Sequence, residues 1–198
     1  MMQFVSHLAP AASDTGGAAA DRAAYWFVFQ EEKLLVRQVG DRAFVPVISG
    51  PAELGLDPLR TVYLGRVEDD GESTDCYAAE IAGGATLPGG FMTEGLRGLY
   101  PLLEEPLMNV AGRAVQLVAF SRTHEFCGQC GGRMIDQTHE RARRCPQCGL
   151  IAYPRLSPAI IIAVTRRIEG KLHILLARNH RFPAGRYSVL AGYVEPGE

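Results

Sequence analysis

The first half of the chain consists of short apolar segments separated by polar and glycine-containing breaks. Each segment has five to seven residues, many of them β-branched or aromatic, and the breaks contain Gly, Pro and acidic residues. This combination is typical of β-strands joined by turns. Strands are predicted at residues 25–30, 33–37, 43–47, 61–66 and 75–81. Together they predict a small, mainly antiparallel sheet.

A helical period replaces the strand pattern towards the middle of the chain. Apolar residues recur there every three or four positions, which places them on one face of a helix. The members of this face are Leu107, Val110, Ala111, Ala114, Leu117 and Val118. We therefore predict a helix across this stretch despite Gly112, and a preceding helix over residues 93–103.

The C-terminal segment returns to strands, whereas the N-terminal residues show no apolar period. Near-continuous apolar runs at 159–165 and 172–177 are joined by a charged turn, and a third strand is expected at 187–191. Residues 1–23 are rich in Ala, Gly, Ser and Asp and are expected to form a flexible lead-in. The pattern favours an α+β chain in four parts, with the bounds 1–23, 24–121, 122–154 and 155–198.

Composition and charge narrow the class of protein. The 198 residues are 47% hydrophobic, enough to bury a core, and no apolar run approaches the ~20 residues that span a bilayer. We therefore expect a soluble protein with no membrane partner. Residues 1–126 carry 9 Lys and Arg against 17 Asp and Glu, whereas residues 127–198 carry 11 against 5. The positive C-terminal part favours an anionic ligand.

Two C-x-x-C pairs are the most chemically specific pattern in the sequence. Cys127 and Cys130 form the first pair, and Cys145 and Cys148 form the second, with fourteen residues between them. Two such turns can direct four thiolates to one ion and complete a closed tetrahedral shell. The spacing therefore predicts a zinc ion that holds structure rather than one that performs catalysis.

Two disulfides or four free thiols are the alternatives to zinc. The N-terminus has no charged-then-apolar secretory leader, so we expect a reducing, cytoplasmic compartment in which disulfides are disfavoured. Cys76 lies alone in an alternating strand segment, which predicts a reduced, half-buried thiol without a function.

The end of the sequence resembles the start of a Nudix box. Residues 190–198 read LAGYVEPGE, in which Gly192 and Glu198 match the first two fixed positions of G-x5-E-x7-R-E-U-x-E-E-x-G-U, where U is a bulky aliphatic residue. A four-cysteine ribbon directly before such a segment, itself preceded by a small domain, is similar to the bacterial NADH pyrophosphatase (NAD diphosphatase) subfamily of Nudix hydrolases. The resemblance implies that residues 155–198 begin an α/β/α Nudix domain.

The same resemblance implies a chemistry. Members of the subfamily hydrolyse the diphosphate of NAD(H) to AMP and nicotinamide mononucleotide and remove NAD caps from RNA, using Mg²⁺ or Mn²⁺ held by glutamates, and relatives form homodimers. Those glutamates belong to the helix after the first part of the box, so we expect the 198 residues by themselves to be inactive. Glu198 would be at most an outer member of that metal cluster, or would close a turn.

Four substrate contacts are also implied by the resemblance: Arg97, Glu140, Tyr153 and Ala191. Tyr153 would stack on or bond to a base or ribose, Arg97 would suit a phosphate, and Ala191 would offer a backbone group. Glu140 and Tyr153, both placed by the cysteine framework, would make the ribbon a wall of the nucleotide pocket. A strand aromatic, a solvated charge and a packing residue are the plain alternatives.

Two other functions stay open on the sequence. A zinc-ribbon module could bind nucleic acid or protein, although the ribbon has four arginines, two acids and no aromatic side chain between Cys127 and Cys148, a poor stacking surface for bases. A Nudix hydrolase could also act on another nucleotide, because the residues that identify NAD preference in the family lie beyond Glu198.

Overall fold

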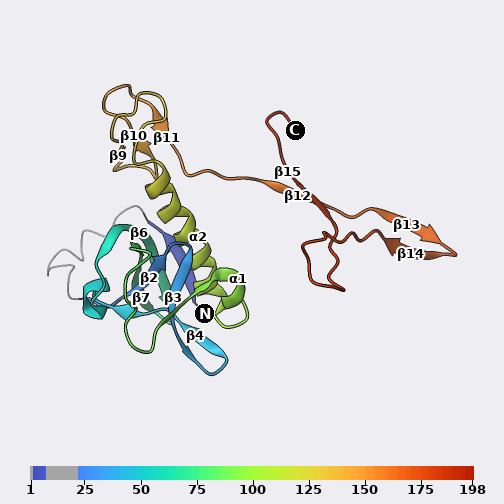
Figure 1. Ribbon diagram of the computed structural model, residues 1–198, viewed down its shortest axis with the longest axis horizontal. Coiled ribbons are helices and arrows are strands. Elements are labelled where there is room, and N and C mark those ends of the chain that lie inside the picture. Colours follow the sequence, from blue (N-terminus) through green and yellow to red (C-terminus); the bar gives the residue numbers. More distant parts are fainter. Residues whose placement is uncertain (1, 8–21) are drawn as a thin grey trace. The chain divides into compact units, whose positions relative to one another are not determined.

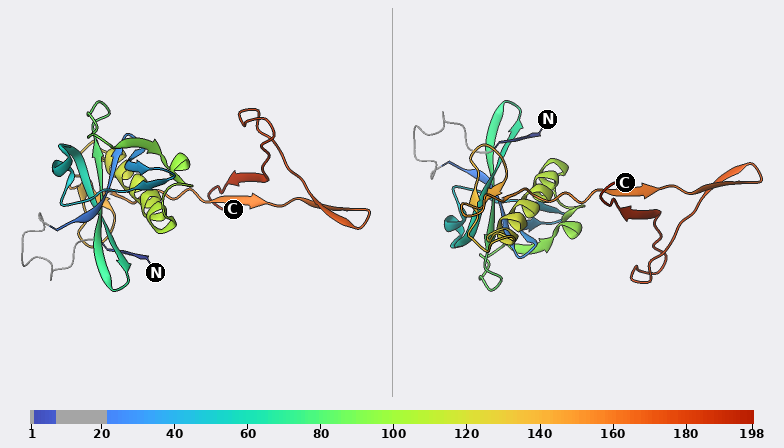
Figure 2. Two further views of the ribbon diagram at one scale, coloured as in Figure 1. Left: turned by 90° about the horizontal axis from the view of Figure 1, so that it is seen from below. Right: turned by 90° about the horizontal axis from the view of Figure 1, so that it is seen from above.

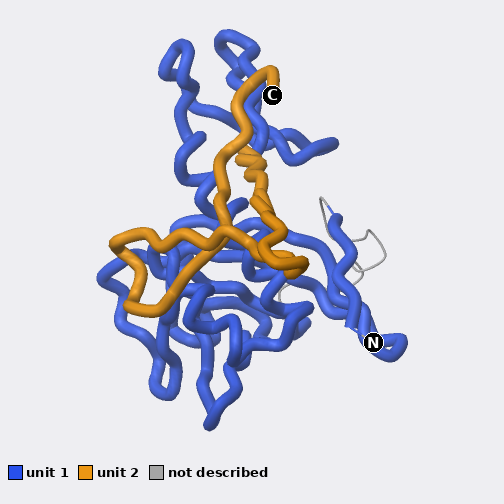
Figure 3. Tube along the Cα trace, turned by 90° about the vertical axis from the view of Figure 1, so that its right-hand side faces the viewer, with its two compact units in different colours: residues 1–154 blue, residues 155–198 orange. Residues whose placement is uncertain are grey.

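The computed structural model describes residues 2–7 and 22–198, which belong to two compact units, residues 1–154 and 155–198 (Figures 1 and 3). The first unit contains an α+β domain and the cysteine ribbon, which confirms the predicted fold class. Residues 1 and 8–21 of the predicted lead-in lie outside the described residues. Within the described part of the chain, no helix has the length and apolar character needed to cross a membrane.

The α+β domain is built on a sheet with the strand order β1-β6-β7-β2-β3-β4, to which β5 is added through β2 and β8 through β3. The bounds are β1 Gln3–Ser6, β2 Ala24–Gln30, β3 Lys33–Val39, β4 Arg42–Phe44, β5 Val47–Ile48, β6 Pro58–Asp69, β7 Glu72–Ile81 and β8 Met92–Gly95. The mainly antiparallel sheet is confirmed, with one parallel pair, β2 with β7, at its centre.

Strand β2 is buried on both faces, which explains its continuous apolar sequence. Phe27 and Phe29 point to one face, and Trp26 and Val28, which alternate with them, point to the other. Helices α1 (Leu96–Leu99) and α2 (Glu105–Thr123) cover the first face, and α2 runs alongside the sheet (Figures 1 and 2). The short helix η2 (Pro51–Leu54) and the loop before β8 cover the second face.

The two predicted helices had different outcomes. The helix over 107–118 is confirmed as α2, and all six residues of its apolar face are buried. The helix over 93–103 is confirmed only at Leu96–Leu99, which forms α1, because residues 100–103 are turns and bends. Its first part is wrong as well: Met92–Gly95 forms β8 and pairs with β3, where Glu94 lies opposite Leu34. The backbone N–H and C=O groups of β8 are paired with those of β3 and not with those of a helical turn. This partner strand lies about sixty residues earlier in the chain.

Two further differences concern strand bounds. Residues 3–6 of the predicted lead-in form β1, which pairs with β6. The predicted strand 43–47 is divided between β4 and β5, and Pro46, which has no N–H to donate, lies between them. The carbonyl of Pro46 accepts a hydrogen bond from the backbone N–H of Trp26. More of the backbone in this domain is therefore hydrogen-bonded in the sheet than the local sequence pattern indicated.

The second unit consists of two-stranded ladders. Strand β12 (Ala159–Ile162) pairs with β15 (Leu190–Tyr193), and β13 (Thr165–Ile168) pairs with β14 (Lys171–Ile174). The predicted run 159–165 is thus divided between two ladders. Every strand residue in this unit is exposed, so residues 155–198 enclose no core of their own.

A buried carboxylate ties the sheet to the end of α2. Glu80 on β7 has a side chain that is only 6% exposed, and its carboxylate lies 2.7 Å from Nε of Arg60 on β6. Arg122, in the last turn of α2, forms a second ion pair with the same carboxylate. Two cations therefore depend on one buried anion, and removal of that anion leaves both uncompensated.

Replacement of Glu80 tests this triad. Glu80→Ala should lower the free energy of unfolding by about 3 kcal/mol, because the two guanidinium groups lose their buried partner. Urea denaturation followed by the fluorescence of Trp26, the single tryptophan, measures the change. Glu72→Ala, at the exposed start of the same strand, should stay within about 0.5 kcal/mol of the parent protein. Equal losses in the two variants would contradict a special role for Glu80.

Candidate functional site

The four cysteines lie on two loops of a small three-stranded sheet, the ribbon, formed by β9 (Ile135–Asp136), β10 (Arg143–Arg144) and β11 (Ile151–Ala152). Both loops have the same backbone geometry. In each, the N–H of the first cysteine donates to a carbonyl five residues on, and the N–H four residues on returns to that cysteine's carbonyl. Gly131 and Gly149 donate these returning bonds with φ of 74° and 79°, a left-handed conformation that favours glycine.

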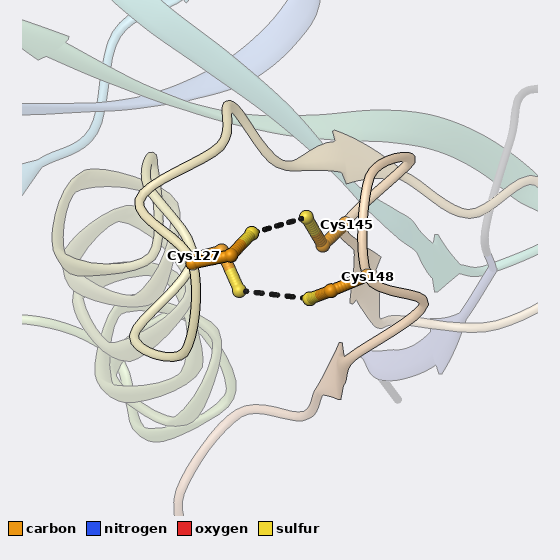
Figure 4. A group of neighbouring side chains, drawn as sticks. Cys127, Cys145 and Cys148 are labelled. Carbon is orange, nitrogen blue, oxygen red and sulfur yellow. Dashed lines mark hydrogen bonds between the residues drawn. The ribbon is translucent and has the colours of Figure 1, made fainter.

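The sulfur atoms of the two loops face one another (Figure 4). All four lie within 4.8 Å of one another, with 3.5 Å between Cys127 and Cys148 and 3.4 Å between Cys130 and Cys145. A disulfide would need about 2.05 Å, and the cysteines are unbonded. Four thiolates about 2.3 Å from one zinc ion would lie roughly 3.8 Å apart. The cluster therefore fits structural zinc and not the disulfide alternative.

Backbone donors favour the thiolate form that zinc binds. The N–H of Cys148 lowers the pKa of Cys145 to about 6, and the N–H of Cys130 lowers the pKa of Cys127. Cys76 has the opposite environment: it is fully buried in the sheet, and burial raises its pKa to about 12. Cys76 is therefore a protonated core residue and is more buried than predicted.

Two arginines attach the ribbon to the α+β domain. Nη1 of Arg143 donates to the carbonyls of Ser121 at 2.8 Å and His124 at 3.1 Å, at the C-terminal end of α2. A cation at this end also interacts favourably with the helix dipole. Nε of Arg143 lies 2.7 Å from the carboxylate of Asp136, and Arg141 donates to carbonyls of β6. The ribbon is thus held against both the helix and the sheet.

Glu140 and Tyr153, two of the predicted substrate contacts, lie together on the ribbon. The hydroxyl of Tyr153 donates to Oε1 of Glu140 at 3.2 Å, and both side chains are exposed. The negative charge of Glu140 raises the pKa of Tyr153. An aromatic ring with a fixed hydroxyl and an adjacent carboxylate offers both a stacking surface and a hydrogen-bond acceptor.

A cavity of about 200 Å³ lies beside Glu140, between the ribbon, β6 and α2. Its apolar side is formed by Val62, Leu117 and Phe120, and its polar side includes Glu140 and Asp136. A cavity of ~150 Å³ is enough to hold benzene, so this one has room for a substituted ring.

The other predicted site residues are Arg97 in the first unit, and Ala191 and Glu198 in the second unit. Arg97 is exposed on α1, which lies at the opposite end of α2 from the ribbon (Figure 1). Ala191 lies in β15 of the second unit. Glu198 accepts a hydrogen bond from the N–H of Glu195 at 2.9 Å, which is the turn-closing contact named as its alternative.

Sequence reasoning missed Arg141, Arg143 and the cavity walls on β6 and α2. The composition of the ribbon could have indicated the role of the arginines. The ribbon has four arginines but only two acidic residues, so some of the arginines need hydrogen-bond acceptors outside it. No local pattern identifies the cavity walls, because Thr61 and Phe120 lie about sixty residues apart in the chain.

The α+β domain and the ribbon of the first unit each match a known protein family. Residues 23–119 match the family described as NADH pyrophosphatase-like rudimentary NUDIX domain, and residues 122–153 match the NADH pyrophosphatase zinc ribbon domain. Both matches agree with the resemblance of this chain to the NADH pyrophosphatase subfamily.

Several bacterial relatives, all named NAD-capped RNA hydrolase NudC, are similar to this chain. The protein of Deinococcus radiodurans is 38% identical over 175 residues, which cover 88% of this chain and 58% of that protein. The protein of Stutzerimonas stutzeri is 43% identical over 129 residues, or 65% and 44%. The protein of Pseudomonas aeruginosa is 55% identical over 87 residues, or 44% and 30%. The chain thus spans about half the length of these relatives or less.

Zinc dependence of the ribbon can be tested directly. Cys145→Ser removes one of the two buried thiolates and should release zinc and loosen residues 127–153, because ribbons of this kind derive their folding free energy from the metal. Metal analysis and limited proteolysis of the purified protein measure both effects. Cys76→Ser, which changes a cysteine outside the cluster, should keep its zinc. Unchanged zinc content in Cys145→Ser would refute the site.

Proposed function

We propose that this chain is the N-terminal part of a Nudix pyrophosphatase that hydrolyses NAD(H) to AMP and nicotinamide mononucleotide and removes NAD caps from RNA. Both family descriptions refer to NADH pyrophosphatase, and the relatives are named for NAD-capped RNA. The observation that carries the proposal is the hydrogen bond of Tyr153 to Glu140, a residue that itself lines a ring-sized cavity.

In this proposal the ribbon recognises the substrate and takes no part in bond cleavage. The ring of Tyr153 stacks on a base, and its hydrogen bond to Glu140 limits the orientations of the ring. The remaining acceptor capacity of the Glu140 carboxylate receives a base N–H or a ribose hydroxyl. Arg97 and Ala191 remain proposed contacts to phosphate and to the nucleotide, respectively.

The proposed hydrolysis also needs Mg²⁺ or Mn²⁺, which neutralises charge on the diphosphate and activates water. Over residues 2–7 and 22–198, the four cysteines are the group in which three or more possible ligand atoms converge. A closed thiolate shell leaves no open position for substrate or water. We therefore propose that the metal-binding glutamates follow Glu198 and that the 198 residues by themselves are inactive.

A nucleic-acid-binding module is the second candidate, and the arginines of the ribbon argue against it. Arg133 lies 2.8 Å from the carboxylate of Glu125, and Arg141 and Arg143 are bound to backbone carbonyls. Few ribbon cations are left to neutralise phosphates, on which such binding depends.

The unbonded cysteines fit the cytoplasmic location that we propose. The homodimer implied by the resemblance stays a prediction.

The activity is tested with the full-length gene product, NADH and Mg²⁺ or Mn²⁺, with AMP and nicotinamide mononucleotide measured by chromatography. Glu140→Ala should raise KM about tenfold or more, because the substrate then lacks the charged carboxylate that accepts its hydrogen bond. Tyr153→Ala should act in the same direction. Tyr100→Phe, a change at an exposed tyrosine next to α1, is the matched control and should leave KM unchanged.

Three outcomes separate the candidate functions. Release of AMP by the full-length protein and none by residues 1–198 supports the proposal. Hydrolysis of another nucleotide but not of NADH would indicate a Nudix enzyme of different specificity. A gene whose sequence past Glu198 lacks an R-E-U-x-E-E segment would leave only the binding module.

A further inference from the structure

The side chain of Arg141 is inserted between the ribbon and the sheet. Its Nη1 donates to the carbonyl of Tyr63 at 2.9 Å, and its Nη2 donates to the carbonyl of Leu64 at 2.9 Å and to that of His7. One planar guanidinium group thus bonds three carbonyls, from β6 and from the residue after β1. A single ribbon side chain thereby holds two segments of the sheet.

Two of these acceptors lie at an irregularity of β6. Tyr63 lies opposite Tyr77 on β7, but Gly65 lies opposite Cys76, so the register skips Leu64. Gly65 has φ of 140°, and a Cβ atom there would lie 2.1 Å from the carbonyl oxygen of Val5. Only glycine permits this close approach of β1, and the resulting bulge takes Leu64 out of the ladder with β7, where its carbonyl also accepts a long hydrogen bond from the N–H of His7 at 3.4 Å.

The charge of Arg141 is compensated by the dipoles of these carbonyls. Burial lowers the pKa of Arg141, and the nearby charge of Arg113 on α2 lowers it further. An arginine stays protonated even so, and the cost of its partial burial is offset by the three acceptors. The contact is therefore sensitive to the shape of the side chain, because a lysine is a point donor that cannot span the same acceptors.

Arg141 also lies in the loop that carries Glu140. The loop between β9 and β10 is short and closed, because the N–H of Gln137 donates to the carbonyl of Ala142 and the N–H of Ala142 donates to that of Glu140, both at 2.9 Å. Arg141 bonds the sheet, while its neighbour Glu140 bonds Tyr153. A single peptide unit therefore separates the contact with the sheet from the contact with Tyr153.

We propose that Arg141 is a positioning residue that fixes Glu140 against Tyr153 by bonding the ribbon loop to the bulge of β6. Arg143 holds the neighbouring strand β10 on α2, so it sets the position of the ribbon without reaching the loop. Arg141 lines the cavity together with Glu140, so loss of its bonds would also change the cavity wall. The expected effect of Arg141 on substrate binding rests on the proposed function. The expected effect on the contact between Glu140 and Tyr153 does not.

The geometric part is tested on the 198-residue chain by ¹³C NMR of labelled tyrosine, with the Tyr153 signal assigned by Tyr153→Phe. In Arg141→Gln the pKa of Tyr153 should fall towards its value in Glu140→Gln, because the carboxylate that raises it is no longer held in place. Arg144→Gln, which changes an exposed arginine on β10, is the matched control and should leave the Tyr153 pKa unchanged.

Zinc content distinguishes positioning from loss of the ribbon fold. A zinc-loaded Arg141→Gln protein with the Tyr153 pKa of the parent would overturn the proposal, as would an equal shift in Arg144→Gln. If Arg141→Gln loses zinc, the proposal is tested with Arg141→Lys, which keeps the positive charge but cannot bond all three carbonyls. The pKa of Tyr153 in Arg141→Lys should lie between the values in the parent protein and in Glu140→Gln. A Tyr153 pKa equal to that of the parent would overturn the proposal.

The functional part uses the full-length protein. Arg141→Gln should raise KM for NADH about fivefold, as expected for one weakened hydrogen bond, with a smaller change in kcat. A fall in kcat at constant KM would overturn the role in substrate positioning. A parent protein inactive on NADH would overturn the proposed function but leave the NMR result intact, so the two failures are distinguishable.

Discussion

The ribbon depends on the need of four thiolates for one shared cation. Its buried apolar side chains are few: Cys127, Met134, Ala142 and Cys145, with Leu150 and Ala152 partly buried. A core of this size cannot offset the conformational entropy of about thirty ordered residues. Backbone donors lower the pKa of Cys127 and Cys145, whereas the pKa of Cys130 and of Cys148 is raised. The four sulfur atoms, which lie within 4.8 Å of one another, are therefore thiolates together only when a metal is bound. The cation therefore decides whether the loops that carry Glu140 and Tyr153 have a fixed shape.

A rigid ribbon is useful to a binding site only if it is fixed to the rest of the protein. The contacts that do this are polar: Arg143 bonds the end of α2, and Arg141 bonds the bulge of β6. Glu80 anchors the same end of α2 to the sheet through Arg122. These groups form a continuous connection from the sheet core through α2 to the ribbon. The cavity beside Glu140 is enclosed by the elements that this connection joins.

The second unit has a different balance of forces. Its strands form regular ladders, but large apolar side chains such as Ile161, Leu156 and Tyr193 are 74%, 84% and 78% exposed. Two-stranded ladders are marginal in water without an apolar face to bury. Residues 155–198 thus hold the strand that contains Ala191 and the turn closed by Glu198, and they provide no core to stabilise either of them.

The sequence alone determined the features whose causes are local. The spacing of the four cysteines specified the metal centre, and the apolar runs and the helical period located β2 and α2. Glu140 and Tyr153 were named through the family resemblance, and their contact with each other came from the structure. Tertiary structure decided the rest. Residues 93–95 became a strand because β3 offered a partner, residues 3–6 were ordered by β6, and Arg141 found its acceptors at a bulge created by Gly65. The physical reason is that a local pattern fixes the preference of a segment, whereas hydrogen-bond partners and cavity walls come from residues far apart in the chain, which only the folded backbone brings together.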